Sequence, residues 1–164
     1  SGSPIQGLAL NRAGIREMAR LNWTDMDVSS WTRSIEGVAI ATYAAKPADE
    51  ARHLLALNVL LCAAPYQWLV TGLEPASDET IAAQLDLVAG TAVALGMLGT
   101  ECGYMLSRGA NGLHIASVIL PNSQEEVSAS GASAGIAMVG AIALAIVERE
   151  HDRLKERTQI DTFG

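Results

Sequence analysis

Apolar residues recur along this chain with helical spacing, and prolines, glycines and acidic turn residues separate the stretches that carry them. The spacing predicts helices over 11–22, over about 28–45 and over about 47–64. The acidic turn before the second of these helices contains Asp27, which is a good N-cap residue. Pro65 interrupts the third helix, because proline cannot continue the backbone hydrogen bonds.

The second half of the chain carries two longer apolar stretches. One helix is predicted from the N-cap Ser77 to about Ser107, and a last helix is predicted over about 123–157. The centre of the connector between them, 113–120, is expected to be a short strand or a buried turn of helix. Together these elements predict an all-α fold, a single-domain bundle of about five or six helices over 1–164, with 1–10 flexible or extended.

Small residues form two rows at helical spacing inside the predicted long helices. Glycine in a helix interior costs about 1 kcal/mol relative to alanine, so such a row needs compensation from a closely packed neighbour. The rows are Ala89, Ala92, Gly96, Gly99 and Gly103, and then Ala134, Ala137, Ala141 and Ala145. Two interpretations stay open: tight packing within one core, and a self-association seam between copies.

The chain is acidic, with a formal charge of −7 at pH 7, and its basic residues are concentrated towards the two ends. Between residues 53 and 148, Arg108 is the only lysine or arginine. A surface of this kind repels a phosphate backbone, so we expect no binding to nucleic acid. It suits a basic protein partner or a metal ion.

The two cysteines and the first residues of the chain indicate the cellular compartment. Cys62 and Cys102 both lie in apolar stretches, where buried free thiols are expected. The segment 1–12 lacks the basic start and apolar core of a signal peptide. These features predict a cytoplasmic protein.

An integral membrane protein is a less favoured alternative. Residues 127–147 carry no charged side chain, and a stretch of that length can span a bilayer. However, Asn58, Pro65 and Gln67 interrupt the other uncharged stretch, 54–73. Helices buried in a soluble bundle or oligomer therefore explain the apolar stretches better.

Two Glu-x-x-His motifs are the most specific chemical pattern in the chain. Residues three apart on a helix share a face, so a carboxylate and an imidazole so placed can bind one metal ion. Two such motifs, with single glutamates from two further helices, form a di-metal site inside a bundle. The candidate ligands are Glu50, His53, Glu101, Glu148 and His151, with Glu17 as a further single glutamate.

In the order of these residues the chain resembles the ferritin-like di-metal carboxylate family. The resemblance implies iron or manganese as the cofactor, and iron oxidation, iron storage or oxygen chemistry as the function. The chain departs from the family in its short loop 72–77, where the family has a long crossover, and in the charged residues around 148–151. If this site is absent, no cofactor is expected.

The stretch 131–138 resembles the segment around the nucleophilic serine of Lon-type proteases, and it places Ser133 at the position of that nucleophile. The family pairs its serine with a lysine well downstream. Lys155 is the only later lysine here, and it lies in an unrelated context. The sequence therefore shows no partner for Ser133, and a role in helix packing is the alternative.

These patterns favour a non-enzymatic helical assembly or adaptor protein that acts through protein–protein interaction and forms homo-oligomers. The alternatives are the di-metal carboxylate protein and the small integral membrane protein.

Overall fold

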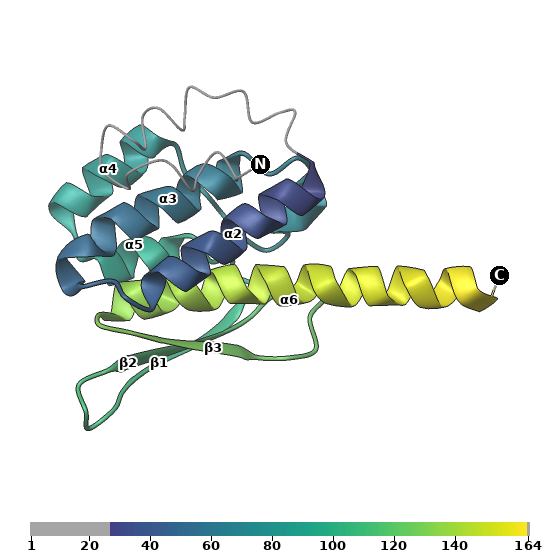
Figure 1. The fold of residues 1–164 in the computed structure, drawn as a ribbon. Coiled ribbons are helices and arrows are strands. Elements are labelled where there is room, and N and C mark those ends of the chain that lie inside the picture. The colour runs from purple at the N-terminus through teal and green to yellow at the C-terminus, as the bar shows by residue number, and fades with distance from the viewer. Residues whose placement is uncertain (1–26, 164) are drawn as a thin grey trace.

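The computed structural model describes residues 27–163, so the predicted helix over 11–22 and the segment 1–10 lie outside the described residues. Helices and a three-stranded sheet make up the fold (Figure 1). The elements are α2 (Val28–Thr42), η2 (Pro47–Asp49), α3 (Glu50–Cys62), η3 (Gln67–Val70), α4 (Asp78–Leu87), α5 (Gly90–Gly96), β1 (Gly103–Arg108), β2 (His114–Ile119), β3 (Val127–Gly131) and α6 (Ala134–Phe163). The predicted all-α class is therefore wrong, because an antiparallel sheet is added to the helices.

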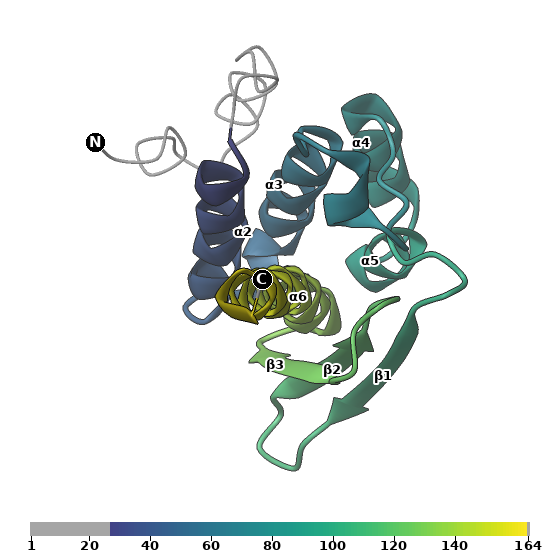
Figure 2. The same cartoon turned by 90° about the vertical axis from the view of Figure 1, so that its right-hand side faces the viewer.

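The long helix α6 lies between a helical layer and the sheet (Figure 2). It packs against α2, α3 and α5 on one side and against β2 and β3 on the other, while α4 packs on α3. Almost every residue from Gly135 to Val147 is buried in this position. Coverage on both sides explains why this part of the sequence carries no charge. Among the described residues, no helix has both the length and the apolar character needed to cross a membrane.

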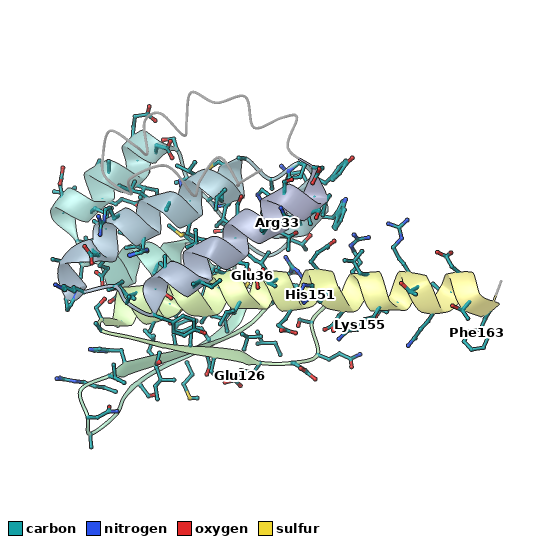
Figure 3. The ribbon with its side chains drawn as sticks, in the orientation of Figure 1. Arg33, Glu36, Glu126, His151, Lys155 and Phe163 are labelled. Carbon is teal, nitrogen blue, oxygen red and sulfur yellow. The ribbon has the colours of Figure 1, made fainter. Side chains whose placement is uncertain are left out.

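From His151 onward α6 leaves the rest of the molecule, and almost all of its side chains are exposed. We call residues 151–163 the C-terminal arm. Figure 3 shows Lys155 and Phe163 along this arm. At its base, the Arg153 guanidinium donates hydrogen bonds to both carboxylate oxygens of Glu150 at 2.8 and 2.6 Å, and it lies 4.5 Å from the ring centre of Trp68.

Two predicted helix starts are confirmed. Asp27 accepts a hydrogen bond from the Ser30 N–H at 2.7 Å and caps α2. Ser77 accepts one from the Thr80 N–H at 3.2 Å and caps α4. Short polar side chains satisfy N–H groups that have no partner within the helix, so these starts can be recognised without tertiary information.

The single helix predicted from Ser77 to Ser107 is wrong, because α4, α5 and β1 occupy this stretch. After α5 the chain turns, and the Gly99 N–H donates a hydrogen bond to the Gly72 carbonyl at 2.7 Å. A Cβ on Gly99 would lie 2.6 Å from that carbonyl oxygen. Gly99 thus permits close passage of two backbones, although it also fits the helical row of small residues.

The last helix is shorter at its start than the predicted 123–157, because it begins at Ala134 after strand β3. Ala129 of β3 is buried against α6, whereas Ser128 and Ser130 are exposed on the opposite face. This strand alternates small apolar and small polar residues, which makes its period of two hard to recognise. For 113–120 the strand alternative is confirmed by β2.

The sheet has the order β1-β2-β3, and both of its strand pairs are antiparallel. A tight hairpin joins β1 to β2, and Gly112 in its turn has a φ of +82°, a left-handed conformation that favours glycine. Directly opposed residues share one face of the sheet. Met105 is opposite Ser117, and Ser117 is opposite Ser128.

Candidate functional site

The structure brings together two residues that the sequence assigned to separate hypotheses. Ser133 directly precedes α6, and its hydroxyl accepts a hydrogen bond from the Ile136 N–H at 3.2 Å. The same hydroxyl donates a hydrogen bond to the Glu50 carboxylate, from the first turn of α3. Ser133 therefore has an acidic partner 83 residues away in the sequence.

Two glycines make room for the Glu50 carboxylate. A Cβ on Gly90, the first residue of α5, would overlap Oε1 of Glu50. A Cβ on Gly135, in the first turn of α6, would lie 2.5 Å from Oε2. The carboxylate thus sits where the first turns of α3, α5 and α6 meet, and the partial positive charge of helix N-termini favours an anion there.

His53 lies one turn after Glu50 on α3 and is only 3% exposed. Burial lowers the pKa of its imidazole, and the positive charge of Arg52 lowers it further, while Asp49 acts in the opposite direction. Among the described residues, Nδ1 of His53 has no hydrogen-bond partner. Burial and the missing partner therefore both disfavour the charged form of the imidazole.

The predicted metal ligands do not converge. Glu50 lies beside Ser133, whereas Glu148 is fifteen positions further along α6, which corresponds to about 22 Å of helix. Glu101 is exposed in the turn before β1, and His151 is exposed at the start of the C-terminal arm. The described part of the chain contains no group of three or more His, Cys, Asp or Glu side chains that could hold a metal ion. Glu17 lies outside the described residues.

The small residues of α6 are used inside one chain. Ala137, Ala141 and Ala145 are buried, while Ala134 is half-buried. A Cβ on the neighbouring Gly140 would lie 2.9 Å from the Thr42 hydroxyl and 3.1 Å from Ala129. Small side chains therefore let α6 fit between α2 and the sheet.

The other row does not form one seam. Ala89, Ala92 and Gly96 are exposed on or beside α5, whereas Gly99 is buried and Gly103 begins β1. A role for either row in contacts between copies is not tested by a single chain and stays a prediction.

The sequence did not identify an apolar surface on the face of the sheet that points away from α6. Ala116 and Val118 of β2 are buried on the α6 side, so Ile115 and Ile119 point the other way. Met105, Ile115 and Ile119 are 59%, 41% and 36% exposed. We call this surface the outer sheet face; it comprises Met105, Ser107, Ile115, Ile119, Ser128 and Ser130, with the buried Ser117 between them.

No charged side chain belongs to the outer sheet face. Its polar members are serines, and the Ser117 and Ser128 hydroxyls hydrogen-bond each other at 2.7 Å. The face can therefore be covered by another apolar surface without burying an unpaired charge. The β-branched residues Ile115, Val118 and Ile119 of β2 were a local signal that could have indicated a strand here.

Comparisons of the chain with protein-family models, with curated proteins and with solved structures found no match.

Proposed function

We propose that this protein is an assembly or adaptor module that acts by binding protein, and that its first partner is another copy of the same chain. The observation that carries the proposal is the uncovered outer sheet face. The solvent face of an antiparallel sheet is ordinarily polar, whereas Met105, Ile115 and Ile119 are exposed on this one. Exposed apolar groups gathered on one surface mark interaction sites.

The charge distribution supports a second copy as the partner. The outer sheet face has no charge of its own, so two copies meet there without opposing like charges at the centre. The face measures about 250 Å², from three strands of five to six residues. A stable interface buries about 800 Å² on each partner, so contact through this face alone would be weak and dependent on concentration.

Sedimentation velocity from low micromolar to several hundred micromolar tests the proposal. We expect reversible association of the wild-type chain, and a dissociation constant at least about tenfold higher for Ile115→Lys, because the lysine charge would be buried. Leu87→Lys is the matched control, since Leu87 is 84% exposed at the end of α4, away from the sheet. A chain that stays monomeric over the whole range contradicts the proposal.

A second candidate function is acyl transfer by Ser133, and the Glu50 contact is the observation that favours it. A serine becomes nucleophilic when a base within hydrogen-bond reach accepts its proton, and the Glu50 carboxylate is so placed. Attack of the Ser133 oxygen on an acyl carbon would transfer the hydroxyl proton to Glu50 and displace the leaving group. The N-terminus of α6 would stabilise the negative charge that develops.

A fluorophosphonate probe tests this second candidate, because it bonds to an activated serine oxygen and releases fluoride. The expected result is labelling that peptide mass spectrometry maps to Ser133 and that Glu50→Gln slows strongly. Ser130→Ala, which alters an exposed serine of β3, serves as the control and should be labelled normally. Absence of labelling at Ser133 rules out this function and leaves the assembly proposal unaffected.

A further inference from the structure

Strand β1 is an edge of the sheet, and its free side carries backbone groups that pair with no other described segment. The hydrogen bond from the Gly109 N–H to the Leu113 carbonyl, at 2.9 Å, shows that Gly109 points its backbone groups to β2, and this fixes the alternation along β1. In an antiparallel pair, residues alternate between pointing their N–H and C=O at the neighbour and away from it. The backbone groups of odd-numbered residues of β1 therefore bond to β2. Tyr104, Leu106 and Arg108 point their N–H and C=O groups to the free edge.

This edge has few of the features that usually block strand pairing. Its sequence contains no proline, and its one charged residue, Arg108, is the last of the strand. Every residue from Gly103 to Arg108 has one direct partner in β2, so no bulge twists the edge away. Proteins commonly protect exposed edges with charges, prolines or bulges, because an open regular edge pairs readily with another strand.

Among residues 27–163, the position of β1 leaves the edge accessible. α6 packs against β2 and β3, and β1 forms the margin of the sheet away from β3 (Figure 2). Tyr104 and Met105 on opposite faces of β1 are both exposed. The strand thus presents an unpaired backbone flanked by apolar side chains on both faces.

We infer that β1 pairs antiparallel with β1 of a second copy, in the register that places Leu106 opposite Leu106 on the two-fold axis. This inference rests on the proposed function and adds a second contact, at the edge of the sheet, to the contact through the outer sheet face. Antiparallel pairing requires outward-pointing residues to face each other, so Tyr104 lies opposite Arg108 of the second copy. The two strands together join the sheets of both copies into one continuous sheet.

Side-chain chemistry favours this register. The two Arg108 side chains lie at opposite ends of the paired strands, so they do not repel each other. Each can instead pack on the Tyr104 ring of the other copy, an arrangement that attracts a guanidinium. On the outer sheet face Met105 lies opposite Ser107 of the second copy, and the apolar surface continues from one copy to the next.

A proline at the free edge tests the backbone contact. Tyr104→Pro removes an N–H that points away from β2, so the hairpin keeps its own hydrogen bonds. Tyr104→Ala is the matched variant, since it removes the ring and keeps the N–H. In sedimentation velocity we expect Tyr104→Pro to raise the dimer dissociation constant about tenfold or more. Tyr104→Ala should raise the dissociation constant much less, because it keeps the N–H.

A cysteine scan tests the register in a chain with Cys62→Ser and Cys102→Ser. Leu106→Cys on the axis should form an intermolecular disulfide under mild oxidation. Tyr104→Cys should not, because the two copies of that position lie four residues apart in register. Circular dichroism and thermal melting of each variant confirm that the chain is folded.

The outcomes separate the inference from the proposed function. If the chain dimerises but Tyr104→Pro leaves the dissociation constant unchanged, or if Tyr104→Cys cross-links as well as Leu106→Cys, edge pairing is overturned and self-association stands. If the wild-type chain does not associate at all, both are overturned.

Discussion

At the residue scale, Glu50 shows how one side chain can join several elements. Its carboxylate contacts the Ser133 hydroxyl and fills the space left by the missing side chains of Gly90 and Gly135. The first turns of three helices are held together in this way. A methyl group from alanine at either glycine would displace the carboxylate. The Glu50 side chain has little freedom to move aside, because it is hydrogen-bonded to Ser133.

We predict that Gly90→Ala lowers the free energy of unfolding by about 1–3 kcal/mol, as overpacking does. Gly37→Ala is the matched control, because no atom of the described residues lies within 4 Å of a Cβ on Gly37 in the middle of α2. It should raise stability by about 0.5–1 kcal/mol, the ordinary gain of alanine over glycine in a helix. Denaturant unfolding measures both, and equal effects of the two substitutions would contradict the packing around Glu50.

His53 leads to a prediction about pH at the same scale. Burial holds its pKa below the ordinary value, so the unfolded chain takes up a proton at higher pH than the folded chain does. The stability associated with this difference is fully present above about pH 6.5 and is lost as pH falls below it. Denaturant unfolding between pH 7.5 and pH 5.5 should show this loss in the wild type.

His53→Gln should flatten the pH dependence, whereas His151→Gln should leave it in place, because His151 is exposed on the C-terminal arm. The same slope in the wild type and in His53→Gln would show that other groups cause the pH dependence.

At the element scale, Arg149 fixes α6 to the loops beside it. Its guanidinium donates hydrogen bonds to the carbonyls of Thr71, Pro121 and Leu69 at 2.8, 3.2 and 2.9 Å. Burial lowers the pKa of this guanidinium from its usual value. Three backbone carbonyls therefore replace the water that the guanidinium would otherwise bind. They hold α6 to the rest of the molecule just before the C-terminal arm begins.

Arg149→Lys should lower the free energy of unfolding by about 2 kcal/mol, because an ammonium on a shorter stem cannot reach all three carbonyls. Arg157→Lys, on the exposed arm of the same helix, should have almost no effect. Thermal or denaturant unfolding compares the two, and equal stability of both variants would show that the Arg149 hydrogen bonds contribute little.

At the scale of the whole molecule, net charge opposes the proposed assembly while the outer sheet face and the β1 edge favour it. Each chain carries a formal charge of −7, so two copies repel over distances comparable with the Debye length. The contact surfaces carry few charges of their own. Salt should therefore strengthen the association by screening the repulsion.

We predict that raising sodium chloride from a low concentration to a few hundred millimolar lowers the dimer dissociation constant by about threefold to tenfold. Sedimentation velocity at several salt concentrations measures this trend. Association that weakens with salt would indicate that ion pairs, rather than an apolar sheet and backbone hydrogen bonds, hold the copies together.

Local features of the sequence were sufficient for much of the helical part. The caps Asp27 and Ser77 and the breaker Pro65 act on their immediate neighbours, so their effect is readable from a few residues. The buried half of α6 is also recognisable, since an uncharged stretch of that length must be covered. Trp31 of α2 is fully buried, and its indole N–H donates a hydrogen bond to the Leu60 carbonyl at 2.8 Å.

Tertiary structure alone decided strands β1 and β3 and the site. β1 has apolar residues in succession and β3 consists mainly of small residues, so their alternation is weak until another strand pairs with them. Ser133 and Glu50 lie 83 residues apart, and no local pattern relates them. Short-range interactions set where helices begin and end, whereas strand pairing and the contact between Glu50 and Ser133 depend on residues that only the folded chain brings together.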